Sequence, residues 1–140
     1  MHKSLFIVWH KKNEVGIKLI DEQHKGIVSI INTFYYMIQK EINKSLLYSC
    51  ISDTMKTYSK IHFITEESFL ELAGYQDLES HRKIHDKLSL SIDTIERKCI
   101  VQNDITPLLE FLKKWWIEHI NIEDKQYAQA LYTYVQSQKR

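Results

Sequence analysis

The chain has 140 residues, enough for one hydrophobic core and too few for two. Hydrophobic residues make up 44% and charged residues 26%, which argues against a disordered chain and against a membrane span. The net charge is +1, with acidic and basic residues interleaved, which argues against nucleic-acid binding. We therefore expect a single domain over residues 1–140.

The first twenty residues alternate in a strand-like way, so we expect an N-terminal arm at 1–20 lying over a helical body at 21–140. The first helical pattern begins after Asp21, a residue type that favours the N-cap. One face of this helix combines a histidine with apolar residues: His24, Ile27, Val28, Ile31, Phe34, Tyr35 and Ile38.

The second helical pattern runs from Ile51 to Ala73, and Gly74 follows it as a C-cap glycine would. His62 and Glu66 lie on its apolar face. Residues four apart differ by only about 40° around a helix axis, so these two side chains can reach one centre.

The third pattern runs from His81 to Cys99, with His81 and His85 again four residues apart. Cys50 and Cys99 are the only cysteines, and they form no C-x-x-C motif. The proposed helices bring them near each other, so a disulfide is geometrically possible. A reducing, cytoplasmic location with two free thiols is the default expectation.

The fourth pattern starts at Thr106 as N-cap, with Pro107 at the first helical position. Its stripe holds Leu108, Leu112, Trp115, Trp116, His119 and Ile122. A further stretch with Tyr127, Leu131, Tyr134 and Val135 continues it or forms a short fifth helix. Four amphipathic helices with short connections predict an all-α, up-down-up-down four-helix bundle with an N-terminal arm and a short C-terminal helix.

Five histidines and a glutamate interrupt four core stripes, where unpaired polar groups cost several kcal/mol. A single H-x-x-x-H pair occurs often by chance, and a lone His24 is more often a hydrogen-bonded core residue, but the combination indicates a metal centre. With Asp124 the set is too large for one tetrahedral zinc and suits two octahedral irons. Five imidazoles, two bridging carboxylates and one bridging solvent oxygen leave one coordination position open.

Asp124 is the least certain ligand on spacing alone. Five residues separate it from His119, which is about 140° around an α-helix, so the two share a face only if the helix bends or restarts. Taken by itself, Asp124 is equally well explained as a solvent-exposed aspartate.

The residues resemble the hemerythrin family in its bacterial single-domain form. The likeness covers nearly the whole chain and rests on these motifs: Trp9, Val15-Gly16-Ile17, Ile20-Asp21-Glu22-Gln23-His24, His62-Phe63, Glu66-Glu67, His81, His85, Trp115, His119-Ile120, Asp124 and Tyr127-Ala128.

The resemblance implies a di-iron centre with a hydroxo or oxo bridge. His81, His85 and His119 would hold one iron, His24 and His62 the other, and Glu66 and Asp124 would bridge, which includes Asp124 among the ligands. We expect the oxygen pocket to be lined by Ile27, Phe63, Trp115, Trp116 and Tyr127. Hemerythrins typically carry leucine where this chain has Trp116, so we expect its indole to fill the pocket or to donate to the bound ligand.

The function implied is reversible dioxygen binding for storage, transport or delivery, by a protein that is not an enzyme and that we expect to be a monomer. One alternative is a di-iron oxidase, or a scavenger of peroxide or nitric oxide. Ferritin-like oxidases use Glu-x-x-His pairs, and this sequence has none. Another alternative is a stand-alone oxygen or redox sensor, which requires an unidentified protein client.

Overall fold

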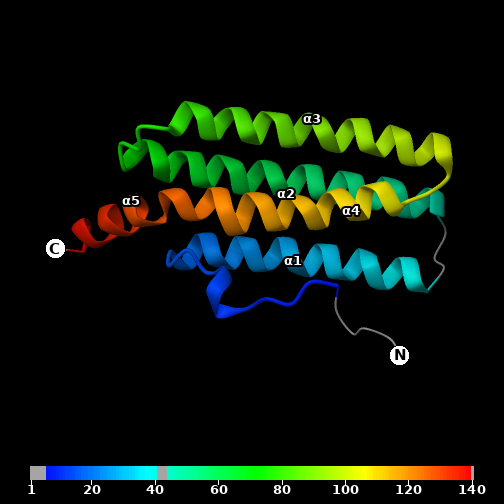
Figure 1. Ribbon diagram of the computed structural model, residues 1–140, viewed down its shortest axis with the longest axis horizontal. Coiled ribbons are helices and arrows are strands. Elements are labelled where there is room, and N and C mark those ends of the chain that lie inside the picture. Colours follow the sequence, from blue (N-terminus) through cyan, green and yellow to red (C-terminus); the bar gives the residue numbers. More distant parts are fainter. Residues whose placement is uncertain (1–5, 41–43, 140) are drawn as a thin grey trace.

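The computed structural model describes residues 6–40 and 44–139, in which four helical rods lie antiparallel side by side (Figure 1). The first three rods are α1 (Lys18–Gln39), α2 (Lys44–Leu72) and α3 (Leu78–Gln102). The fourth joins three segments end to end: α4 (Thr106–Trp115), η2 (Trp116–Glu123) and α5 (Asp124–Ser137). α1 packs against α2 and α4, and α3 packs against the same two helices. The predicted all-α, up-down-up-down bundle with a C-terminal helix is confirmed.

The described part of the arm, residues 6–17, runs alongside α1 and contains one short 3-10 helix, η1 (Lys11–Asn13), and no strand (Figure 1). The Asn32 side chain accepts the backbone N–H of Ile7 at 2.8 Å and donates to the carbonyl of the same residue at 2.8 Å. Asn13 donates to Asn121 at 2.7 Å and so fastens the arm to the fourth rod. Residues 1–5 of the predicted arm lie outside the described residues.

Asp21 is not the N-cap of α1, because the helix begins three residues earlier, at Lys18, than the predicted start at 21. The Asp21 carboxylate instead accepts the backbone N–H of Val15 at 2.7 Å and that of Gly16 at 3.1 Å. Gly16 has a φ of +92°, a conformation that glycine adopts without steric cost. Asp21 therefore fixes the turn that leads from the arm into α1.

α2 begins before the predicted start at Ile51, and α3 extends three residues beyond both predicted ends, His81 and Cys99, whereas the boundaries predicted at Gly74 and Thr106 agree to within one residue. Gly74, with a φ of +68°, ends α2 as predicted, and the Tyr75 N–H donates to the Leu70 carbonyl at 3.0 Å. Thr106 is the first helical residue of α4 and Ile105 its N-cap, so the N-cap prediction for Thr106 was wrong by one position.

The fourth rod changes from an α-helix to a π-helix along η2. The Asp124 N–H donates to the His119 carbonyl, five residues back, where an α-helix would bond four residues back. Ile122, which was predicted in the core, is 56% exposed on this segment, and Ile120 is fully buried instead.

The hydrophobic core forms two clusters. The larger cluster contains Ile27, Met55, Phe63 and Leu112, and the smaller contains Ile20 and Leu70 with residues of α5. On α1 the boundary between the clusters falls at His24, between Ile20 and Ile27. Within the described residues, no helix is long and apolar enough to cross a bilayer.

Candidate metal centre

The seven predicted ligands meet at the boundary between the two hydrophobic clusters, and none of them is more than 5% exposed. They form two overlapping groups whose ligand atoms lie within 4.8 Å of one another. One group contains His81, His85 and His119, and these three histidines are here called the three-histidine set. The other group contains His24 and His62, and these two histidines are here called the two-histidine set. Glu66 and Asp124 belong to both groups.

Glu66 points one carboxylate oxygen at each set. Oε1 lies 2.5 Å from Nε2 of His81 and 3.2 Å from Nε2 of His85. Oε2 lies 3.1 Å from Nε2 of His62 and accepts a hydrogen bond from the Tyr127 hydroxyl at 2.5 Å. One carboxylate from α2 therefore faces both sets.

Asp124 has the same arrangement from the opposite side. Its Oδ2 lies 3.0 Å from Nε2 of His24, and its Oδ1 lies 3.1 Å from Nε2 of His119. Neither oxygen has a hydrogen-bond partner, although both are fully buried. The π-helical turn explains how Asp124 reaches the centre, because the longer step brings a residue five positions after His119 onto the same face.

The burial of these groups shifts their pKa values strongly. Burial by itself would raise the pKa of Glu66, but the imidazoles around it, His62 first, hold that pKa well below its usual range. Burial, followed by the negative charge of Glu66, raises the pKa of Asp124 well above its usual range. Burial lowers the pKa of His119 to about 4 and also lowers the pKa of His62. The neutral imidazoles of His62 and His119 and the uncompensated carboxyl group of Asp124 are donors suited to binding cations.

The outer nitrogen of His62 is held by an amide. The Nδ1 of His62 lies 2.8 Å from the Gln23 side-chain oxygen, and the Gln23 amide nitrogen donates to Thr65 at 3.2 Å. That contact fixes the amide orientation, so Nδ1 carries the proton and the Nε2 lone pair points into the centre. Tyr58 supports the same residue by donating to the Gln23 carbonyl at 2.9 Å.

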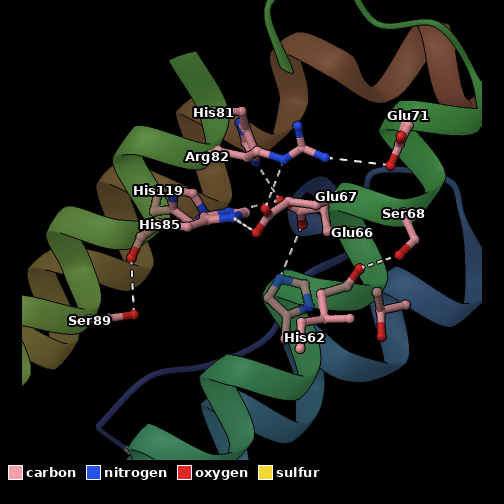
Figure 2. Close-up of polar contacts among 12 residues, drawn as sticks. His62, Glu66, Glu67, Ser68, Glu71, His81, Arg82, His85, Ser89 and His119 are labelled. Carbon is pink, nitrogen blue, oxygen red and sulfur yellow. Dashed lines mark hydrogen bonds and ion pairs between the residues drawn. The ribbon is translucent and has the colours of Figure 1, made fainter. Parts of the chain in front are cut away.

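Carboxylates hold the outer nitrogens of two histidines in the other set. The Nδ1 of His85 lies 2.9 Å from Glu67, and the Nδ1 of His119 lies 3.0 Å from Glu123. Arg82 donates through Nε to Glu67 at 3.2 Å, and Figure 2 shows its guanidinium lying between Glu67 and Glu71. These contacts place the Nε2 lone pairs of His85 and His119 toward the centre.

Three residues that hold the histidines were not predicted from the sequence to have a role: Gln23, Glu67 and Glu123. Each carried a signal in its spacing. Gln23 directly precedes a ligand, Glu67 directly follows one, and Glu123 stands four residues after His119 on the same rod.

Four of the five expected pocket residues share the larger hydrophobic cluster: Ile27, Phe63, Trp115 and Trp116. Phe63 stacks on His85 with ring centroids 3.9 Å apart, and Trp115 stacks on His119 at 5.8 Å. Trp116 lies under the arm in edge contact with Trp9, and its indole nitrogen is buried without a hydrogen-bond partner. Tyr127 lies in the smaller cluster, with its hydroxyl on Glu66.

A pair of divalent metal ions fits this donor set. The Nε2 atoms of His24 and His62 lie 3.2 Å apart, as do those of His85 and His119. Because Nδ1 of His85 and of His119 contacts a carboxylate, the Nε2 lone pairs of these two histidines face each other. The Asp124 oxygens, which have no hydrogen-bond partner, face the same space, and cations between these atoms would satisfy them.

Comparisons with known proteins agree with this interpretation. The family model described as the hemerythrin HHE cation binding domain matches residues 15–131. A bacteriohemerythrin of Clostridium acetobutylicum is 30% identical over 125 residues, covering 86% of this chain and 97% of that protein. A myohemerythrin of Theromyzon tessulatum is 27% identical, covering 88% of this chain and 92% of that protein. The crystal structure of a wild-type hemerythrin has a TM-score of 0.77 and 25% identity, and it covers 90% of this chain.

Proposed function

The chain belongs to the hemerythrin family, and from that premise we propose that it binds dioxygen reversibly at a di-iron centre, for storage, transport or delivery. We propose as ligands the three-histidine set (His81, His85, His119), the two-histidine set (His24, His62) and the carboxylates Glu66 and Asp124.

The observation that carries the proposal is that the two sets contain unequal numbers of histidines and share two carboxylates, each of which faces both sets. Three imidazoles and two carboxylate oxygens give five donors on one side, whereas two imidazoles and two oxygens give four on the other. One solvent oxygen shared by both metals raises these numbers to six and five. An octahedral pair then keeps one open position, on the two-histidine side.

When bound, the iron pair supplies the electrons and the open position that take up dioxygen. Burial lowers the pKa of His62 and His119, which favours their neutral, metal-binding form, and Gln23 and Glu123 hold their outer nitrogens. The larger hydrophobic cluster adjoins the centre where Phe63 and Trp115 stack on His85 and His119, and we propose that these two residues form the oxygen pocket together with Ile27 and Trp116 of the same cluster. A dry, apolar pocket favours a small neutral ligand over water and anions.

Binding rather than catalysis is supported by the composition of the donor set. Two carboxylates among seven ligands make a less anionic centre than the carboxylate-rich sites of ferritin-like oxidases, and a less anionic centre stabilises highly oxidised iron less well. We therefore propose a carrier and not an enzyme.

We propose a single domain over residues 1–140, acting as a monomer in the cytoplasm. The two free cysteines, Cys50 at the surface and Cys99 in the core, support a reducing compartment. Light scattering on the purified protein tests the monomer.

The proposed function is tested by loading the protein with Fe(II) without oxygen, then adding and removing oxygen while absorbance is followed. Repeated gain and loss of the oxygenated spectrum is the expected result. A single irreversible conversion to the di-ferric form would instead support an oxidase or a sensor.

A further inference from the structure

A cleft of about 390 Å³ opens between α2 and α3, and it reaches a predicted iron ligand from the protein surface. Its inner wall contains Phe63 and His85, which are 5% and 2% exposed. Ser59 and Ser89 flank the inner wall from the two helices. Figure 2 shows Ser89 on α3 beside His85, its hydroxyl bonded to the His85 carbonyl at 3.1 Å.

Phe63 separates this cleft from the centre. Its ring stacks on His85 at 3.9 Å, meets His119 at 6.0 Å and lies 5.8 Å from His62. It therefore touches histidines of both sets on one side and lines the cleft on the other. A route from the cleft to the space between the two sets would therefore have to pass this phenyl ring.

Ser59 keeps the inner cleft open. It stands four residues before Phe63, on the same face of α2, and is 2% exposed. Its hydroxyl has no hydrogen-bond partner, which is unusual for a buried polar group. A larger apolar residue here would gain packing and lose no hydrogen bond, so a small side chain at this position is explained by the space that it leaves.

A second hollow, of about 240 Å³, lies under the arm and ends on Trp116. Its lining includes none of the seven predicted ligands. Trp116 is 6% exposed and wedged against Trp9, so an indole that is fastened by the arm closes this side. The cleft between α2 and α3 thus comes nearer to the centre, behind a smaller ring.

We propose that dioxygen enters and leaves the centre through the cleft between α2 and α3, with Phe63 as its gate; this inference rests on the proposed function. The aromatic floor selects a small neutral molecule, since an anion would shed its water there without a buried cation to pair with. The charged residues at the rim have both signs, including Lys56, Lys60, Glu67 and Asp93, so they attract no particular ion.

The test fills the cleft without touching a ligand. Ser59→Leu fills its inner end, and Ser89→Leu narrows it at an exposed position where misfolding is less of a risk. In both variants we expect the rates of dioxygen binding and release to fall together by about tenfold, with unchanged affinity, because a route changes the barrier and not the end states. Ser59→Ala, and Ser29→Leu in the separate groove beside the arm, should behave like the wild type.

Stopped-flow kinetics on variants with two irons per chain decides the question. Unchanged rates in both filled variants would overturn the route. So would a Trp116→Leu variant that speeds binding and release equally while the serine variants have no effect, because that result places the entrance under the arm.

Xenon separates the route from the proposed function, because it needs no iron and no reversible chemistry. Crystals of metal-free protein under xenon pressure should show xenon in the cleft of the wild type and none in Ser59→Leu. If dioxygen binding proves irreversible while xenon occupies the cleft, the carrier function fails and the route stands. Xenon found only under the arm would overturn the route.

Discussion

The two histidine sets of this bundle differ less in their own residues than in what stands behind them. Carboxylates hold His85 and His119 of the three-histidine set, through Glu67 and Glu123. An amide holds His62 of the two-histidine set, and the outer nitrogen of His24 is buried without a hydrogen-bond partner.

This difference points the same way as the donor count. An imidazole that donates to a carboxylate is the stronger metal ligand, so the three-histidine side is built to hold a more positive ion. The two-histidine side has weaker support and one donor fewer. We infer that one half of the centre is for holding the pair and the other for binding the ligand.

The largest effect on iron binding is expected at Glu66, whose carboxylate faces both halves of the centre. Glu66→Ala removes one donor from each iron at once, so we expect the variant to lose the iron pair. Metal analysis of purified protein tests this, with Glu79→Ala as a control, because Glu79 contacts Arg82 at the surface and no histidine. Two tightly bound irons in Glu66→Ala would contradict the bridging role.

Removal of the metal tests whether both halves need it. Without a cation, the two buried Asp124 oxygens have no hydrogen-bond partner and the inward imidazole nitrogens crowd one another, so we expect a lower melting temperature at pH 7. If the metal is present at a thousand times its dissociation constant, it contributes about 4 kcal/mol of stability. Calorimetry on loaded and chelated protein gives the comparison, and equal melting temperatures would refute it.

Exchanging the carboxylate and amide partners of the outer histidine nitrogens should reverse the difference in iron affinity between the two halves. Glu67→Gln and Glu123→Gln should weaken iron binding on the three-histidine side by about 10-fold to 100-fold, whereas Gln23→Glu should strengthen it on the two-histidine side. Competition with chelators of graded affinity measures the loss of each iron. Glu79→Gln is the matched control, because Glu79 contacts Arg82 at the surface and no histidine. An equal loss in all variants would remove the basis for distinguishing the halves.

Acid should destabilise the metal-free protein through one histidine of each half. Burial lowers the pKa of His119 to about 4 and also lowers that of His62, so below pH 6.5 the unfolded chain takes up protons at these two residues before the folded chain does. The raised pKa of Asp124 acts in the opposite direction, because the folded chain takes up a proton there before the unfolded chain does. His119 by itself lowers the free energy of unfolding by about 1.4 kcal/mol for each unit of pH lost between roughly 6.5 and 4, so with His62 we expect a net fall on acidification.

Urea unfolding of chelated protein across that range measures the slope. The variant Asp124→Asn removes the opposing proton and should make the fall in stability on acidification steeper. Stability that rises on acidification would show that the histidines are not buried in neutral form.

The smallest effect is expected at Trp116. Trp116→Leu leaves every ligand in place and opens space in the proposed pocket, so we expect release of dioxygen to quicken by a few-fold with unchanged iron content. Stopped-flow release measures it, and Ile117→Leu on the exposed side of the same turn is the control. Release that is equally fast or slower in Trp116→Leu would mean that Trp116 is ordinary core packing.

The sequence predicted the bundle and the convergence of the seven side chains, because each helix buries one stripe and the histidines lie in those stripes. Spacing alone did not decide Asp124 and misplaced Ile122. Both problems have one cause: the π-helical turn breaks the 3.6-residue period on which such arguments rest.

The residues that hold the histidines were missed for a different reason. The side chains of Glu67 and Glu123 are 23% and 31% exposed, so in the sequence these residues cannot be distinguished from ordinary surface charges. Only the folded arrangement shows that one end of each carboxylate reaches a buried imidazole.

The π-helical segment η2 also determines which face of α5 points into the bundle. If this segment became α-helical while keeping all its residues, α5 would turn by about 100° about its own axis. Asp124 would leave the centre, and the same rotation would carry Tyr127 and Leu131, now fully buried, toward water. The wide turn thus couples metal binding to the packing of the C-terminal helix, so a substitution that straightens it would disturb both even if it spares every ligand.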